Sequence, residues 1–414
     1  MGKQSVWTKT TTLLSRGVVA AALLVGAASS SWTVPLQAQS GTIVLTPTVG
    51  VTPPLTIVTV NDGPEVQLFP HVGGDLVSYS DTHYENDRLP LKYFRFSTGV
   101  TSQIPLGDAI ADYWPDIDDG RITFTRFFSD RDAIMLFDTS TSALNEILPA
   151  AGSARQMSGI GGNTLAFVDL RKTDGSFGSG DIVAYDLTSA LSTRLTASID
   201  TFNEFPSVSH DGQTIVWTNC TPGLVPGGEL IPCGTMAAVW DNSVAAWSVK
   251  TISPTPAHGS EIADTDGTWI TYSYSPSASP TEEDVYFVPV AGGPARRLAL
   301  AGQQAYPSIS RGVISFTSYE DWAHGSIFLY VIATNTLYQV TSPHNLGLSG
   351  VDVLDSGAIR LAWSSADNDA PESGLNVYAT TFRVPLTTTS QTCLLYDPAL
   401  VKKRGSAFPI KVQL

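Results

Sequence analysis

Charged residues are scarce in this sequence, and the few present are unbalanced. Only 15% of the 414 residues are charged, and 38 acidic residues outnumber 23 lysines and arginines, which gives a formal net charge of −15. A chain this acidic repels nucleic acid and anionic membrane surfaces, so neither is expected as a partner. After residue 40 no long window has the apolar spacing of an amphipathic helix. The short runs of Val, Ile, Thr and aromatic residues instead predict an all-β chain.

Cysteine is also rare, with three residues. Cys220 and Cys233 flank a Gly/Pro-rich loop, and in an exported protein a disulfide between them is the simplest interpretation. The alternative is two unpaired thiols. Cys393 is left without an evident partner, and the wide spacing without a C-x-x-C pair argues against a zinc site.

Motifs of common hydrolases are missing. The chain has neither a G-x-S-x-G nucleophile elbow nor an H-E-x-x-H zinc motif. Its six histidines are scattered along the chain: His71, His83, His210, His258, His324 and His344. Catalysis is therefore not predicted from motifs, although a histidine beside a carboxylate, such as His258 near Glu261, can act as a general base.

The first 38 residues have the pattern of an export signal. Lys3, Lys9 and Arg16 precede the apolar run "GVVAAALLVGAA", and "VPLQA" ends on the small residue Ala38. The apolar run is short for a membrane span, so a cleaved signal peptide is predicted, with an uncleaved anchor as the alternative. Cleavage removes three cations and no acids, so the formal charge changes from −15 to −18. A periplasmic or secreted location follows, with no stable membrane span after cleavage.

A repeat organises the remaining chain. The segment "FPSVSHDGQTIVWT" (205–218) contains an extended run, an Asp-Gly turn and a strand ending on an aromatic residue. Seven such copies have turn glycines at positions 74, 120, 162, 212, 267, 312 and 357, which are 42 to 55 residues apart. Two further apolar strands follow in most copies, as in "GDIVAYDLTSALSTRLT" (180–196). Four short strands per repeat of this length are typical of β-propeller blades.

The last copy has no clear fourth strand, whereas "LTIVTV" (55–60) precedes the first copy and belongs to none. This segment can complete the last blade and close the ring, which removes open sheet edges. The predicted fold is therefore a seven-bladed β-propeller over 55–386, with four antiparallel strands per blade and an N-terminal closing strand. Residues 39–54 are then a Thr/Pro-rich linker and 387–414 a tail. Seven aromatic residues that end the second strands are expected in the core: Tyr79, Phe124, Phe167, Trp217, Tyr272, Phe316 and Trp363.

The repeat resembles that of TolB-type propellers. The strings "PSVSHDGQTIVWT" and "DVYFVPVAGGPARRLA" are similar to its P-x-[IV]-S-x-D-G turn hairpin and its R-L-T end. The resemblance covers nearly all of 55–386 and implies a WD-like propeller that binds proteins. Seven copies differ from the six blades of TolB, and no room is left here for its N-terminal α/β domain. The tail "TCLLYDPALVKKRGSAFPIKVQL" (392–414) resembles the opening of a small β-sandwich module of secreted bacterial proteins, or else is a basic extension.

Acidic residues gather in the loops after the second strands and in the connections between blades. In a propeller these loops share one face, so the sequence predicts a ring of carboxylates there. The candidate binding face comprises Asp81, Glu85, Asp87, Asp130, Asp132, Asp169, Asp174, His258, Glu261, Glu282, Glu283, Glu320, Asp321, Asp367 and Asp369. Such a ring suits a basic peptide. Alternatively, each acid only caps its own turn, or the oxygens hold Ca²⁺.

The leading hypothesis is a monomeric, non-enzymatic scaffold that binds a protein or peptide in the cell envelope or outside the cell, without a cofactor. The alternative is a carbohydrate- or peptide-active lyase or hydrolase with a His/carboxylate site at the channel mouth. "DIDDG" (116–120) is similar to a calcium loop but lacks the distal Glu and coincides with a repeat turn. It is therefore interpreted as a turn.

Overall fold

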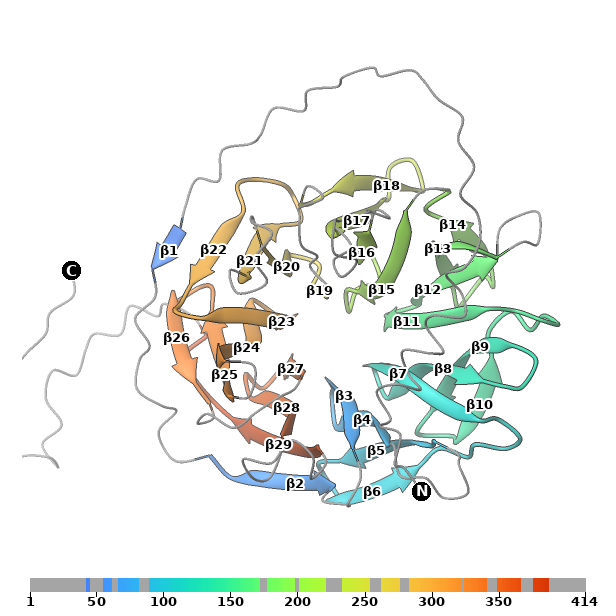
Figure 1. Ribbon diagram of the computed structural model, residues 1–414, viewed down its shortest axis with the longest axis horizontal. Coiled ribbons are helices and arrows are strands. Elements are labelled where there is room, and N and C mark those ends of the chain that lie inside the picture. Colours follow the sequence, from blue (N-terminus) through green and yellow to red (C-terminus); the bar gives the residue numbers. More distant parts are fainter. Residues whose placement is uncertain are drawn as a thin grey trace, which may run out of the picture.

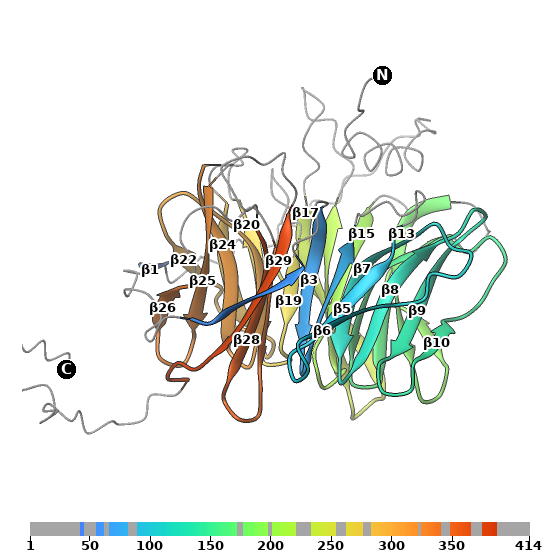
Figure 2. The same ribbon diagram turned by 90° about the horizontal axis from the view of Figure 1, so that it is seen from below.

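The computed structural model of the chain describes residues 42–44, 55–61, 66–81, 89–171, 177–197, 201–220, 233–253, 262–275, 283–321, 324–340, 348–365 and 375–386. The described strands form seven antiparallel sheets around a central axis (Figure 1). Seen from the side, the strands run along this axis and their hairpins lie at the two ends of the ring (Figure 2). The predicted seven-bladed β-propeller is confirmed.

The blades follow each other in chain order. Blade 1 contains β3 (Gln67–Gly73), β4 (Leu76–Asp81), β5 (Leu91–Arg95) and β6 (Val100–Gln103). Blade 2 contains β7 (Ala111–Asp118), β8 (Arg121–Phe127), β9 (Asp132–Asp138) and β10 (Ala143–Glu146). Blade 3 contains β11 (Arg155–Gly161), β12 (Thr164–Arg171), β13 (Phe177–Asp186) and β14 (Ser192–Arg194). Blade 4 contains β15 (Phe202–Val208), β16 (Thr214–Cys220), β17 (Cys233–Asp241) and β18 (Ala246–Thr251).

The second half of the ring has the same order. Blade 5 contains β19 (Ala263–Thr265), β20 (Trp269–Tyr274), β21 (Asp284–Pro289) and β22 (Arg296–Ala299). Blade 6 contains β23 (Gln303–Ser310), β24 (Val313–Asp321), β25 (His324–Val331) and β26 (Thr336–Gln339). Blade 7 contains β27 (Ser349–Val353), β28 (Ile359–Ser365) and β29 (Asn376–Phe382).

The fourth strand of blade 7 comes from the N-terminal side of the chain. β2 (Ile57–Asn61) pairs antiparallel with β29, with Val58 opposite Ala379. The prediction that "LTIVTV" closes the ring is confirmed. A second short strand, β1 (Thr42–Val44), pairs in parallel with the outer strand of blade 5, β22. β1 lies within residues 39–54, which the sequence predicts to be a linker.

Burial between neighbouring blades explains why the repeat folds this way. The second strand of each blade has neighbouring blades on both of its faces, and in β4 every residue is buried. The seven predicted core aromatics are all buried, with at most 3% of their surface exposed. Apolar clusters extend from blade to blade, as between Val285 of blade 5 and Phe316 of blade 6. Radial stacking thus buries sheet faces that a single blade would leave in water.

The tight turns between first and second strands require glycine. All seven repeat glycines have positive φ, between +52° and +84°, a region that other residues enter at a cost. At Gly161 the requirement is steric, because a Cβ atom there would collide with the backbone carbonyl oxygen of Ser209 in the next blade. The inner strands of blades 3 and 4 therefore approach closely.

The predicted disulfide is present between Cys220 and Cys233, which lie opposite each other on β16 and β17. It clamps the base of the longest insertion in the repeat, with a sequence separation of 13. A buried disulfide favours an oxidising compartment. Among the described residues no helix is long and apolar enough to cross a bilayer.

Candidate functional site: the central channel

The first strands of the seven blades surround a central channel with a cavity volume of about 500 Å³. Its lining comes from β3, β7, β11, β15, β19, β23 and β27, together with the turns that follow them. Because these strands are anchored by their whole blades, side chains in the channel are held on a rigid frame. The channel lining divides into an apolar level and an acidic level.

The apolar level is a collar of five large side chains: Phe69, Trp114, Met157, Phe205 and Tyr306. Each occupies the same place in its inner strand, and each has a positive φ between +49° and +57°. The pairing register breaks at each of these positions, as in a β-bulge. Left-handed backbone is costly for a bulky residue. Its occurrence in five blades shows that the fold imposes it, and strain of this kind often lies at binding sites.

The acidic level lies further along the inner strands and in their turns, two to five residues after Trp114 in blade 2 and six after Phe205 in blade 4. Eight aspartates line the channel together with one arginine, Arg311: Asp116, Asp118, Asp119, Asp211, Asp264, Asp266, Asp352 and Asp355. The sum of their charges favours cations over anions in the channel. Among the described residues, however, no group of three His, Cys, Asp or Glu side chains is placed to hold a metal ion.

Five of these aspartates join neighbouring blades, and we call these contacts the blade clasps. In each clasp a carboxylate oxygen accepts a hydrogen bond from a backbone N–H of the next blade, at 2.6 to 2.8 Å. The acceptor and donor pairs are Asp116 with Ile160, Asp118 with Gly162, Asp264 with Ile309, Asp266 with Gly312, and Asp352 with Gly74. Charged acceptors make stronger hydrogen bonds than neutral ones, so the clasps tie blade 2 to 3, 5 to 6 and 7 to 1.

Hydroxyl groups extend the clasps to two further blade contacts. Ser310 Oγ accepts a hydrogen bond from Val353 N at 3.0 Å and donates to Asp352 Oδ1 at 3.1 Å, which joins blades 6 and 7. Ser207 Oγ donates to Asp264 Oδ1 at 2.5 Å, which joins blades 4 and 5. Most of the acidic level is therefore engaged in holding the ring together.

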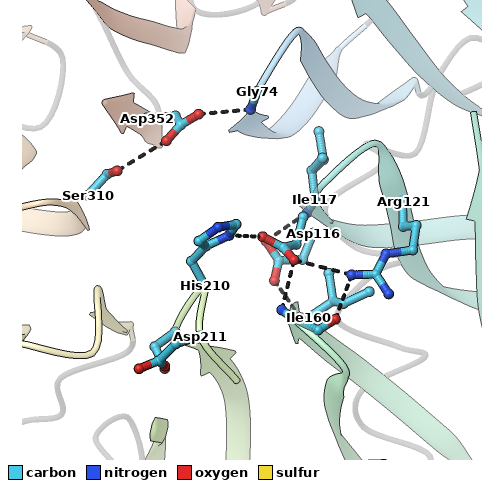
Figure 3. A network of polar contacts seen from close by, with 12 residues as sticks. Gly74, Asp116, Ile117, Arg121, Ile160, His210, Asp211, Ser310 and Asp352 are labelled. Atoms are coloured by element: carbon cyan, nitrogen blue, oxygen red, sulfur yellow. Dashed lines mark hydrogen bonds and ion pairs between the residues drawn. The ribbon is translucent and has the colours of Figure 1, made fainter. Parts of the chain in front are cut away.

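Two histidines contact the clasp aspartates. His71 Nδ1 lies 3.2 Å from Asp116 Oδ1, and His210 Nδ1 lies 2.5 Å from Asp118 Oδ1. His210 belongs to blade 4 and reaches past blade 3 to a carboxylate of blade 2 (Figure 3). About 71% of the His210 side chain is exposed, while Asp118 is 8% exposed. An accessible imidazole thus rests against a buried carboxylate.

These contacts shift the pKa values of both partners. The hydrogen bond and charge of Asp118 raise the pKa of His210, against a smaller opposing effect of burial. Burial lowers the pKa of His71, but Asp116 and the charge of Asp264 outweigh it, so that pKa is raised as well. Burial raises the pKa of Asp118, although His210 counteracts it, and burial likewise raises the pKa of Asp264.

At two of the contacts between blades, an arginine adds a further hydrogen bond to the clasp. Arg121 Nη2 donates to the carbonyl oxygen of Gly162 at 2.5 Å and lies 3.3 Å from Asp118 Oδ2. At the seam where the ring closes, Arg360 makes the equivalent bond to the carbonyl oxygen of Gly74, and its guanidinium lies 4.5 Å from the ring centroid of Phe96. The turn glycine of the next blade is thus held at both its N–H and its C=O.

The loop face predicted from the sequence is described only in part. Asp81 is buried and pairs with Lys92, and Asp132 accepts a hydrogen bond from Gln156 at 2.6 Å. Glu283 accepts one from Gln303 at 2.7 Å, Asp169 lies 3.6 Å from Arg155 and from Arg194, and Asp130 is 68% exposed beside Arg131. The side chains of the other members of this face lie outside the described residues: Glu85, Asp87, Asp174, His258, Glu261, Glu282, Glu320, Asp321, Asp367 and Asp369. The predicted binding role of this face stays a prediction.

The sequence did not identify the channel aspartates as site residues, because they lie in the same repeat motif that defines the blades. "DIDDG" and "ADTDG" carry aspartates at alternate positions of an inner strand, so both point to the same side. Two repeats have this alternation, whereas "VDVLDSG" carries its aspartates three positions apart. The aspartates at alternate positions of a channel-lining strand were the signal available in the sequence. They were interpreted only as residues of a turn.

Proteins of known structure are similar to this chain in fold. No protein-family model matches the chain, and no curated protein matches its sequence. The β-propeller domain of the Trilobed protease from Pyrococcus furiosus, described as an open velcro topology, superposes with a TM-score of 0.54 at 13% identity, over 76% of this chain and 95% of that one. An oligogalacturonate lyase in complex with manganese superposes with a TM-score of 0.53 at 13% identity, over 80% of this chain and 96% of that one.

A third match is the acylaminoacyl peptidase of Pyrococcus horikoshii, with a TM-score of 0.51 at 14% identity over 72% of this chain. This chain spans about half of that peptidase, 49% of its length. TolB from Acinetobacter baumannii also matches, but its TM-score of 0.44 is too low to support an argument. The shared feature is the fold. Unlike the open velcro domain, this chain closes its ring with β2.

Proposed function

We propose that this protein is an exported propeller that binds a segment of another protein or a peptide, and that the central channel is its binding site. The observation that carries the proposal is the order of the channel lining, in which an apolar collar is followed by an acidic level. Binding sites of this size are mostly apolar with a few well-placed polar groups. The ligand that fits is a peptide segment with an apolar or aromatic side chain followed by a lysine, an arginine or a free amino terminus.

The negative charge of the channel contributes mainly to recruitment. The clasp carboxylates are engaged with backbone N–H groups, so a cationic ligand is attracted by their summed charge without displacing these bonds. Asp119 and Asp355 line the channel without clasping a blade, and Asp355 is 94% exposed. They are therefore suitable positions for lowering the charge while the ring stays intact. The acidic loop face remains a second candidate contact surface for the same partner.

A calorimetric titration tests the proposal. The ligands are synthetic nonapeptides that combine one tryptophan with two lysines, and reference peptides in which glutamates replace the lysines. Saturable binding of the lysine peptides is expected, weakened roughly tenfold or more by Trp114→Ala and weakened by added salt. The double variant Asp119→Asn/Asp355→Asn should reduce the salt dependence, with exposed Val100→Ala as the control. Equal binding of both peptide types, or no effect of Trp114→Ala, would refute the channel as the site.

One observation favours an enzyme as the second candidate. His210 is exposed to the channel and held by one ring nitrogen on buried Asp118, an arrangement in which the second nitrogen can act as a general base. If the protein is a lyase or hydrolase, turnover of oligogalacturonate or of a chromogenic peptide should fall at least about a hundredfold in His210→Asn. An absence of turnover with either substrate leaves only the binding role.

A further inference from the structure

The outer strands of blades 3 and 4 differ in length, and the difference uncovers apolar surface at the rim of the propeller. β18 has 6 residues, whereas the facing outer strand β14 has 3. Trp247 and Val249 lie on the same side of β18 because side chains alternate along a strand. Trp247 packs with Leu195 on the apolar cluster between the two blades, so this side of β18 faces blade 3. Beyond the end of β14, nothing in the described chain covers it.

A half-open pocket of about 320 Å³ occupies this place, and we call it the rim pocket. It is lined by Thr193, Arg194, Leu195, Trp240, Ala245, Ala246, Trp247 and Val249. Trp240 and Trp247 are direct cross-strand partners, and their rings meet edge to face with centroids 5.3 Å apart. The rim pocket is the outward continuation of the buried interface between blades 3 and 4, and it lies far from the channel axis (Figure 1).

Exposed apolar residues lie on β18 and next to the ends of β14 and β18, the strands that line the rim pocket. Leu191 immediately before β14 is 69% exposed, Val244 before β18 is 68% exposed, and Val249 is 42% exposed. In the described chain seven large apolar side chains are this exposed, and three of them lie here. Contiguous exposed apolar surface on a soluble protein commonly marks a contact site.

β14 offers hydrogen-bonding groups next to the pocket. It is the outermost strand of its sheet. Leu191 O accepts a hydrogen bond from β13 at 2.9 Å, and Leu195 N donates one to β13 at 2.8 Å. The backbone N–H and C=O groups of the odd-numbered residues therefore point toward β13. In an antiparallel ladder the alternate residues, Ser192 and Arg194, then point their backbone N–H and C=O groups outward. An open edge of this kind can pair with another extended segment.

The chain itself shows that an outer edge of this propeller accepts a fifth strand. β1, with the sequence Thr-Ile-Val, lies in parallel on β22 of blade 5, with Thr42 opposite Arg297 and Val44 opposite Ala299 (Figure 1). β22 is the counterpart of β14 in its own blade. The occupant in blade 5 is short, extended and rich in β-branched residues. The same chemistry fits β14, where the adjacent pocket adds a place for a large side chain.

We propose that the rim between blades 3 and 4 binds an extended peptide segment of a partner protein as a fifth strand on β14. The segment alternates β-branched residues with an aromatic or long aliphatic side chain that enters the rim pocket between Trp240, Trp247 and Val249. Main-chain hydrogen bonds to Ser192 and Arg194 supply affinity, and the pocket supplies selectivity for the side chain. This site is separate from the channel and does not depend on the function proposed for it.

A labelled heptapeptide, Thr-Val-Thr-Trp-Thr-Val-Thr, is the probe, and fluorescence polarisation with the full chain is the readout. Three changes separate the parts of the site. Methylation of alternate peptide nitrogens blocks strand pairing and keeps the side chains. Ser192→Pro removes an outward N–H, which an edge strand tolerates, and Ser192→Ala is its matched control. Trp247→Ala empties the pocket, and Val100→Ala alters an exposed apolar residue on the outer strand of blade 1.

Saturable binding of the probe is expected. N-methylation, Ser192→Pro and Trp247→Ala should each weaken it by roughly tenfold, and both controls should stay within about twofold. Tyr306→Ala, in the channel and outside the apolar cluster that supports Trp247, should leave the rim affinity unchanged, which keeps this test independent of the channel. Unchanged binding of the methylated peptide or of Ser192→Pro overturns strand addition. Binding of an oligosaccharide at Trp247 without binding of the peptide would assign the rim pocket to sugars and refute the proposal.

Discussion

At the scale of single residues, the aspartates of the repeat hold blades together. Asp352 has both oxygens engaged, since Oδ2 accepts from Gly74 N at 2.8 Å and Oδ1 from Ser310 Oγ at 3.1 Å. It therefore connects blades 6, 7 and 1 at the seam where the two ends of the ring meet. Asp355, three residues away, pairs with Arg311, and the two side chains are 94% and 51% exposed. Substitutions at Asp352 and Asp355 can therefore be compared to measure how much one clasp contributes to stability.

Asp352→Ala should lower the free energy of unfolding by about 1.5 to 3 kcal/mol, because a hydrogen bond to a charged acceptor is lost and Gly74 N is left unpaired. Asp355→Ala should change it by less than about 0.5 kcal/mol, as expected for an exposed ion pair. Urea unfolding followed by tryptophan fluorescence measures both. A similar loss in the two variants would show that the clasp contributes nothing specific.

Another residue-scale feature lies in the hairpins between third and fourth strands. Ala190 has a φ of +56°, and its N–H bonds to Asp186 O at 2.9 Å. Gly99 occupies the equivalent place in blade 1, with a φ of +67° and the same bond to Arg95 O at 2.8 Å. Since alanine pays a steric cost in this region, Ala190→Gly should stabilise the protein by about 0.5 kcal/mol. The thermal midpoint should rise slightly, and a fall would show that the entropy of the unfolded glycine dominates.

At the scale of elements, ring closure depends on how β2 is seated. Val60 is 6% exposed and packs with Val77 and Tyr79 of blade 1, whereas Ile57 on the same strand is 50% exposed. One strand thus carries one buried and one exposed apolar side chain.

Val60→Asp should destabilise the propeller by about 3 to 5 kcal/mol, because it leaves an uncompensated charge in the apolar cluster. Ile57→Asp places the same charge in water and should be nearly neutral. Circular dichroism during thermal unfolding gives both values. If the two variants melt alike, β2 does not close the ring in solution.

The elements also show which parts of the fold the sequence could predict. β2 was predictable, because one apolar run before the first repeat belonged to no blade and the last blade lacked a fourth strand. The turns were predictable because glycine is needed at each one. β1 was not, since three residues carry no periodic signal and their pairing with β22 depends on where the finished rim lies. The clasps were missed for the same reason, because Asp118 and Gly162 are brought together by blade packing and not by local sequence.

At the scale of the whole molecule, the two histidines make ring stability depend on pH. The pKa values of His71 and His210 are raised in the folded protein by Asp116 and Asp118, so folding favours the protonated imidazoles. For a raised pKa, the stabilisation is fully present below the unfolded value near 6.5 and is lost as pH rises through the folded value. The other groups facing these rings are Asp119, Arg121, Asp264 and Asp352.

The thermal midpoint should therefore fall as pH rises above about 6.5, which is above the ordinary carboxylate range. Burial raises the pKa of Asp112 to about 6 despite its bond to Arg126. Titration of Asp112 therefore also lowers stability as pH rises, but at lower pH than titration of the histidines. The double variant His71→Asn/His210→Asn should flatten the slope in this pH range, because asparagine keeps a hydrogen-bond donor and cannot titrate. The variant Val100→Ala, at an exposed position that does not line the channel, serves as the control. A slope that persists in the double variant would place the pH dependence elsewhere in the molecule.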